Sequence, residues 1–179
     1  MRAIDILRAE HEEIHEGLAL LLSFAERIAT GERVAPGAFA PVLGFLEVFA
    51  DGIHHANEET LLFPALERSG FPRERGPLAV MFHEHEQSRV LLRAMQHAAD
   101  DMPHDPTARS RFVKAARVYA DLLANHMGKE DGVLFVIAEK ILSPAEAEAL
   151  DEAFARFDET MIRSAAAGRR FSDLAKPST

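Results

Sequence analysis

The stretch "HHANEETLLFPALE", residues His54 to Glu67, places histidines and acids where a helix would carry packing residues. A second stretch, "HMGKEDGVLFVIAE" from His126 to Glu139, repeats the same order of residue types. In each, a histidine is followed four residues later by a glutamate, then by another acid, Leu-Phe and a closing glutamate. Side chains four residues apart share one face of a helix, so both stretches predict helices that present a His–Glu pair.

Apolar residues around these stretches recur at steps of three and four, which indicates amphipathic helices rather than strands. We expect a first helix that ends at residues 30–32, a second over about 36–68, a third from about 76 to 100 and a fourth from about 106. The fourth should bury one stripe of residues: Phe112, Ala116, Tyr119, Leu123, His126, Glu130, Val133 and Ile137. Long helices joined by short loops favour an all-α fold, an antiparallel up-down four-helix bundle over residues 1–142.

A shorter helix is expected after the bundle. Ser143 and Pro144, followed by Glu146, form a typical helix start. We assign residues 143–166 to an accessory helix, which either covers the bundle or forms a homodimer contact. Residues 167–179 have no clear periodicity and are expected to be a flexible tail.

The second predicted helix contains an irregularity. Phe45, Leu46 and Phe49 define an apolar face, but His54 and Glu58 lie about 100° around the helix from it. Either the buried face drifts along the helix, or the turn near residues 51–52 is distorted, for example by a π-bulge. Such bulges are frequent at functional sites.

The composition limits the classes of partner and site. The 179 residues are 47% hydrophobic and 27% charged, which fits one globular domain. A net charge of −9 argues against nucleic acid or an anionic membrane as a partner, and the N-terminal stretch resembles neither a signal nor a transit peptide. The absence of cysteine excludes thiolate metal sites and cysteine nucleophiles, and it favours a cytoplasmic protein.

The internal repeat extends beyond the opening stretches. "AEHEE" around His11 and "HEHEQ" around His85 share the step Glu-His-Glu, and each precedes one His-x-x-x-Glu pair at a similar distance. The chain therefore offers four histidines and two glutamates that can face one point: His11, His54, Glu58, His85, His126 and Glu130. Burying these groups unpaired would be costly, and two divalent cations would remove that cost if both glutamates bridge them.

Each of these patterns also has a purely structural explanation. A lone inward histidine is more often a hydrogen-bonded core residue, and a single His-x-x-x-Glu is often a solvent-facing pair. Two matched copies favour the metal site. His15, His55 and Asp131 are weaker candidates for extra ligands or for groups that support the ligands. The remaining histidines are expected on the surface, namely His83, His97 and His104.

Together these residues resemble the hemerythrin-like, or HHE cation-binding, family. The resemblance rests on His11, on His54 with Glu58, on His85, and on His126 with Glu130 or Asp131. It implies a four-helix bundle with a non-haem di-iron centre, an oxo or hydroxo bridge, and binding or sensing of O2, nitric oxide or a peroxide.

The chain departs from the oxygen-carrying members at two places. Their third helix has His-x-x-x-His, and Met81 stands here at the earlier position, which argues against reversible oxygen carriage. His15 or His55 could fill the coordination position left by Met81. The oxygen carriers place the last carboxylate at the position of Asp131, but the internal repeat favours Glu130.

Three functions remain open at this stage. The leading one is a di-iron protein that binds or senses a small diatomic or peroxide ligand. The second is an oxidase, peroxidase or catalase-like enzyme at the same centre, for which the open coordination positions would be required. The third is a bundle in which a structural ion such as zinc or manganese replaces iron. We expect no separate catalytic residue and no further cofactor.

Overall fold

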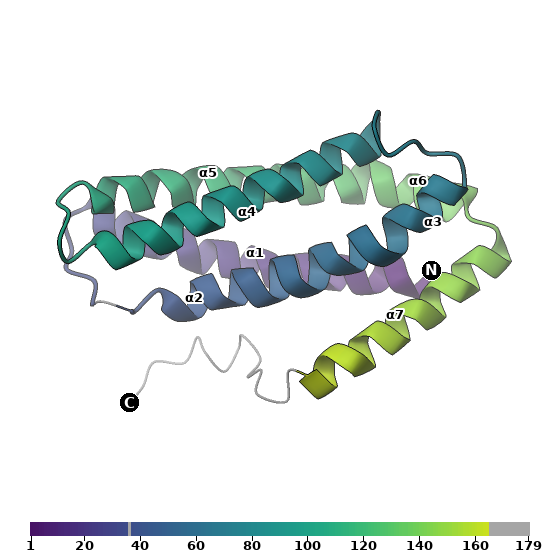
Figure 1. The fold of residues 1–179 in the computed structure, drawn as a ribbon, viewed down its shortest axis with the longest axis horizontal. Helices are drawn as coiled ribbons and strands as arrows, with labels where there is room; N and C mark the ends of the chain where they lie inside the picture. Colours follow the sequence, from purple (N-terminus) through teal and green to yellow (C-terminus); the bar gives the residue numbers. More distant parts are fainter. Residues whose placement is uncertain (36, 165–179) are drawn as a thin grey trace.

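The structure is a computed structural model that describes residues 1–35 and 37–164. Their regular structure is entirely helical, which confirms the all-α prediction (Figure 1). The expected tail, residues 167–179, and the end of the expected accessory helix lie outside the described residues. Within them, no helix is long and apolar enough to cross a membrane.

Five helical rods follow one another along the chain. The first is α1 (Arg2–Ala29), and the third is α4 (Pro77–Asp101). The second and fourth rods each change helix type partway along, and a last helix follows them. The second rod consists of α2 (Ala40–Phe45), π-helices η1 (Leu46–His55) and η2 (Glu58–Leu62), and α3 (Phe63–Arg68); the fourth of α5 (Ala108–Lys129), π-helix η3 (Glu130–Leu134) and α6 (Phe135–Ile141); the last is α7 (Pro144–Ser164).

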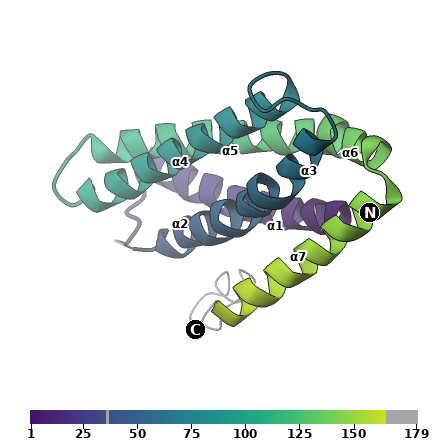
Figure 2. The same ribbon diagram turned by 45° about the vertical axis from the view of Figure 1, so that its right-hand side comes forward.

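The first four rods lie along the long axis of the molecule, and α7 crosses obliquely near the N-terminus (Figures 1 and 2). Packing between neighbours closes a ring, in which α1 contacts α2 and η1, η1 contacts α4, α4 contacts α5, and α5 contacts α1. Gly17 allows the approach of α1 to α2, because a Cβ there would lie 2.5 Å from the Phe45 ring. The ring encloses two apolar clusters. One contains Ile14, Leu18 and Tyr119, and the other contains Leu7, Phe63 and Phe135.

The last helix is fixed to α1 and to the second rod. Asp151 of α7 accepts hydrogen bonds from the backbone N–H groups of Arg2 and Ala3, at 3.2 and 2.7 Å. These N–H groups at the start of α1 have no partner within their own helix. Phe154 of α7 is completely buried in the second apolar cluster. Hence α7 both caps α1 and extends the core.

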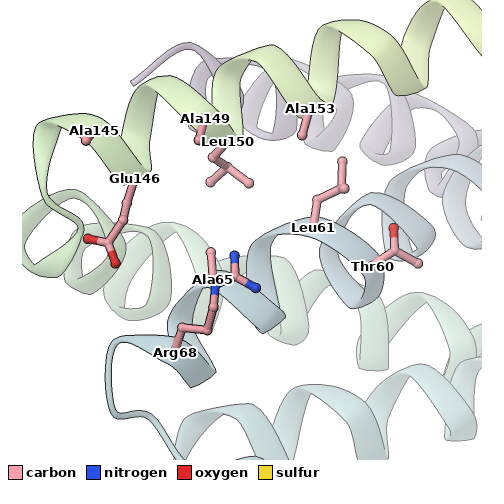
Figure 3. A pocket seen from close by; sticks show the side chains of 9 residues that line it. All are labelled: Thr60, Leu61, Ala65, Arg68, Ala145, Glu146, Ala149, Leu150 and Ala153. Atoms are coloured by element: carbon pink, nitrogen blue, oxygen red, sulfur yellow. The ribbon is translucent and has the colours of Figure 1, made fainter.

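A groove remains between α7 and the second rod (Figure 3). It has a volume of about 360 Å³. Ala145, Ala149 and Ala153 line it from α7, opposite Leu61 and Ala65. Small side chains on one helix face leave this space open.

One buried stripe differs from the sequence prediction. Val133 was expected inside, but its side chain is 50% exposed. The cause is η3, because a π-helical turn holds more residues than an α-helical turn and shifts the buried face by about one position. Leu134 and Ala138 are buried instead, while Ile137 is only half-buried.

Candidate metal centre

The repeated histidines and glutamates meet in a buried layer between the two apolar clusters. They come from α1 (His11), η1 (His54), η2 (Glu58), α4 (His85) and the fourth rod (His126, Glu130). None of these side chains is more than 2% exposed. The structure therefore brings the six predicted residues together, as the spacing alone suggested.

The π-helices place these residues. The expected irregularity in the second rod is a distortion, because residues 46–55 form the π-helix η1. In a regular α-helix His54 and His55 would point about 100° apart. Here both are buried, at 0% and 1% exposure, since the wider π-helical turn reduces the rotation between consecutive residues. The second and third π-helices begin at Glu58 and Glu130.

Two sets of potential ligand atoms share the glutamates. One set is His11, His54, Glu58 and Glu130, and the other is His85, His126, Glu58 and Glu130; within each, the ligand atoms lie within 4.8 Å of one another. Glu58 and Glu130 therefore each lie between an imidazole of the first set and an imidazole of the second set.

The distances describe this sharing. Glu58 Oε2 lies 3.8 Å from His54 Nε2 and 3.3 Å from His85 Nε2. Glu130 Oε2 lies 3.3 Å from His11 Nε2, and its Oε1 lies 3.2 Å from His126 Nε2. These distances bring imidazole and carboxylate donors close enough together to bind a cation.

A further carboxylate contacts the outer nitrogen of each imidazole. Glu10 lies 2.8 Å from His54 Nδ1, and Glu84 lies 2.9 Å from His126 Nδ1. Where the carboxylate accepts the Nδ1 proton, Nε2 is left with a lone pair for a metal. The other three pairs are His85 with Glu59 at 2.7 Å, His11 with Asp131 at 3.2 Å, and His55 with Asp51 at 3.3 Å.

The repeated Leu-Phe also has a role at this centre. Phe63 stacks on the His85 ring with centroids 5.6 Å apart, and Phe135 stacks on His11 at 5.4 Å. Each phenylalanine therefore closes the apolar side of an imidazole on a neighbouring rod, which limits the directions in which the ring can turn.

Most of the inner polar atoms lack hydrogen-bond partners and so fit a cation; the exceptions are Nε2 of His85 and Nε2 of His126, which lie 3.0 Å apart. His11 Nε2, His54 Nε2 and all four carboxylate oxygens of Glu58 and Glu130 are buried without a hydrogen bond. Several carboxylate oxygens lie within 4 Å of an imidazole nitrogen, but not in hydrogen-bonding geometry. Leaving such groups unsatisfied costs free energy. Imidazole and carboxylate donors suit iron, zinc or manganese, so this donor set fits metal binding.

Burial and neighbouring charges shift the pKa values of the two inner glutamates in opposite directions. Burial and repulsion from Glu130 hold the pKa of Glu58 well above its usual range. Burial also opposes ionisation of Glu130, but His126 and His11 keep the pKa of Glu130 well below its usual range. Burial, with repulsion from His11, lowers the pKa of His54 to about 3. The His54 imidazole is thus neutral, which is the form that binds a metal.

The weaker candidates have different positions. His55 lies with His85 and His126, as described below, whereas His15 is exposed and belongs to none of the sets formed by the described residues. Asp131 is outside the inner sets and contacts His11 Nδ1 instead. His83, His97 and His104 are exposed, which confirms their expected surface position.

The sequence patterns did not identify most of the outer carboxylates, namely Glu10, Asp51, Glu59 and Glu84. A signal was present for some of them. Glu10 and Glu84 are the first residues of the repeated Glu-His-Glu step, and Glu59 and Asp131 follow the two inner glutamates. Asp51 contacts His55 on the same rod, but the partners of the other carboxylates lie on other rods, so the spacing along one helix could not reveal them.

The chain is similar to a known protein family and to known proteins. The model of the hemerythrin HHE cation binding domain matches residues 2–138. The iron-sulfur cluster repair protein YtfE of Edwardsiella ictaluri is 30% identical over 129 residues, and that of Enterobacter sp. (strain 638) is 29% identical over 130 residues. Each match covers 70% of this chain and 58% of the relative, so the chain spans less than two thirds of their length.

Proposed function

Because the chain belongs to the hemerythrin HHE cation-binding family, we propose that its buried layer holds two non-haem iron ions and binds O2, nitric oxide or a peroxide. The observation that carries this proposal is the sharing of Glu58 and Glu130 between two sets of imidazoles. A single ion would need only one set.

The proposed assignment divides the residues between two positions. His11 and His54 would hold one ion, His85 and His126 the other, and Glu58 with Glu130 would bridge both. The bound iron would supply the redox chemistry. The chain's own residues orient the imidazoles through the outer carboxylates, and Phe63 and Phe135 cover the rings. Zinc or manganese could occupy the same donors.

The finer arrangement of the fold is part of the proposal. We propose that residues 1–142 form an antiparallel up-down four-helix bundle, which would give the centre a two-fold pseudosymmetry, and that residues 143–166 form an accessory helix on it. The contact of Asp151 with the start of α1 supports this division. A cytoplasmic location, a homodimer and the absence of nucleic-acid or membrane partners remain predictions.

Anaerobic titration of the metal-free protein with ferrous iron tests the proposal. We expect binding to saturate near two iron ions per chain, and addition of nitric oxide or O2 to change the visible absorption spectrum. The paired variant Glu58→Leu and Glu130→Leu should lose the second ion, whereas Glu12→Leu on the exposed face of α1 should bind as the unmodified protein does. Saturation at one ion, or binding of zinc but not iron, would contradict the proposal.

Turnover assays separate binding from catalysis at this centre. A binding or sensing protein binds one equivalent of peroxide or nitric oxide per centre, whereas an enzyme continues to consume the ligand. We propose the binding role first, because the inner residues are fully buried.

A second candidate function comes from the relatives. Several of them are named iron-sulfur cluster repair proteins, and a centre that holds iron could take part in such repair. This chain has no cysteine, so its own iron would be held by histidines and carboxylates. Incubation of the iron-loaded protein with a nitric oxide-damaged iron–sulfur enzyme should restore that enzyme's activity, and the metal-free protein should not.

A further inference from the structure

We propose that His55 is a resident metal ligand, the third imidazole of the His85–His126 position, and that Arg89 is a positioning residue that holds it there. The inference rests on the proposed metal centre and adds to it. It assigns five imidazoles to the centre, unequally divided between the two metal positions.

The His55 ring is buried next to the rings of His85 and His126. His55 is 1% exposed, and its ligand atom lies within 4.8 Å of those of His85 and His126. Its ring stacks on that of His85, with centroids 3.9 Å apart and planes 16° apart, and meets the His126 ring edge-on at 5.6 Å. Three imidazoles from three rods thus converge, and two of them, His85 and His126, also lie close to the shared glutamates.

The tautomer that Asp51 favours supports a ligand role. Asp51 Oδ1 lies 3.3 Å from His55 Nδ1. If Nδ1 donates to this carboxylate, Nε2 has the lone pair that a metal needs. The same relationship holds for His85 with Glu59 and for His126 with Glu84. All three imidazoles therefore share one feature, a carboxylate in contact with Nδ1.

The chain also leaves room for this ligand on α4. One turn before His85 stands Met81, which is 3% exposed and packs within an apolar cluster. A thioether is a soft donor and a poor ligand for iron in an imidazole and carboxylate site. A third imidazole near this position is available from another rod, because His55 of the π-helix η1 is buried beside His85.

Arg89 connects the supports of two of the three imidazoles. Its Nε donates to Asp51 Oδ1 at 2.8 Å, and its Nη2 donates to Glu59 Oε1 at 2.7 Å. Asp51 in turn contacts His55, and Glu59 contacts His85. The planar guanidinium has several donors in fixed directions, so one side chain sets both carboxylates and, through them, both stacked rings.

This arrangement occurs on one side of the repeat only. The residue that corresponds to Arg89 in the first half of the chain is His15, which is exposed and has no such contact among the described residues. The His11–His54 position consequently has two imidazoles and no equivalent clamp. The two metal positions should therefore differ in affinity, with the His55 position the tighter one.

Two substitutions of His55 separate a ligand from a stacking partner. His55→Phe keeps a flat ring against His85 but removes both nitrogens, and His55→Leu provides a second variant if the first does not fold. The matched control is His97→Phe, because His97 is exposed on α4. For Arg89, the pair is Arg89→Met and Arg89→Lys, and the control is Arg93→Met, since Arg93 is exposed on the same helix and pairs with Glu86.

The measurements are iron per chain, iron affinity in competition with a chelator, and the number of imidazole ligands from X-ray absorption. We expect His55→Phe to lower the number of imidazoles per centre from five to four and to weaken binding at the tighter position. Arg89→Met should weaken it roughly 10- to 100-fold, as loss of outer support does in other metal sites. Arg89→Lys should recover part of that loss, and both controls should bind as the unmodified protein does.

The outcomes are distinguishable. If His55→Phe or His55→Leu folds and binds iron with an unchanged affinity and imidazole number, His55 only stacks and the inference is wrong. If Arg89→Met leaves the affinity unchanged while His55→Phe reduces it, the positioning role is overturned and the ligand role stands. If the unmodified protein does not bind two metals, the proposed function fails instead.

Discussion

Glu10 and its neighbour His11 have different roles at the same centre. His11 points Nε2 toward Glu130, whereas Glu10 Oε2 lies 2.8 Å from Nδ1 of His54 on the next rod. Burial raises the pKa of Glu10 to about 7, although His11 opposes the shift. Glu84 and His85 repeat this division, since Glu84 contacts His126. The centre is therefore interlocked, because the rod that provides one ligand also orients a ligand on the adjacent rod.

The first prediction concerns this interlock. Glu10→Leu should weaken iron binding roughly 10- to 100-fold, because His54 loses the group that fixes its ring and tautomer. Glu10→Gln, which keeps an acceptor oxygen, should have a smaller effect. Isothermal titration with ferrous iron measures both, with Glu12→Gln on the exposed face of α1 as the control. Equal binding by Glu10→Leu and the control would show that His54 is oriented without Glu10.

Removal of the metal should lower thermal stability. The oxygens of Glu58 and Glu130 and Nε2 of His11 and of His54 are buried without hydrogen-bond partners, so a bound cation stabilises the folded state selectively. At a free metal concentration about 1,000 times the dissociation constant, linkage gives about 4 kcal/mol, or roughly 8–16 °C in Tm for a chain of this size. Calorimetry of the loaded and chelator-treated protein tests this. A Tm that does not depend on metal would argue against any ion at the centre.

The shift of the buried face in η3 can be tested directly. Val133→Lys should change the free energy of unfolding by no more than about 0.5 kcal/mol, because the side chain is half-exposed. Leu134→Ala should cost about 2–5 kcal/mol, because Leu134 is 1% exposed in the core. Urea unfolding of the two variants gives both values. The reverse order would mean that residues 130–134 continue the regular α-helix.

The contact between α7 and the start of α1 gives a fourth prediction. Asp151→Ala should destabilise the protein by about 0.5–2 kcal/mol, since two backbone N–H groups lose their acceptor. Glu152→Ala changes the next residue, which is exposed and pairs only within α7 among the described contacts, and should have little effect. Denaturant unfolding compares them. An unchanged stability of Asp151→Ala would indicate that α7 docks through Leu150 and Phe154 alone.

The helical class and the six inner residues were accessible from sequence, because both depend on local spacing. The buried residues of α1, which include Ile4, Leu7 and Ile14, recur at the period of an α-helix. His54 with Glu58 and His126 with Glu130 were identified because each pair lies on one turn of one helix. The internal repeat then indicated that the pairs belong to one site.

The π-helices limited how well residue spacing could predict which side chains are buried. The irregular face of the second rod was recognised, but a wider turn and a drifting face predict the same sequence offset. For the same reason Val133 was placed inside, and His55 could not be distinguished from His15 as an additional ligand. A change of about one residue per turn is too small to leave a signature in the order of residue types.

The sequence by itself determined which residues could bind a cation, since the period of a helix puts His and Glu on one face. Only the tertiary structure decided how they are shared. Glu10 contacts His54, Glu59 contacts His85, and Arg89 joins Glu59 to Asp51, all between side chains on different rods. Such contacts depend on how the rods pack and where each π-helix turns the chain, which are properties of the folded molecule as a whole.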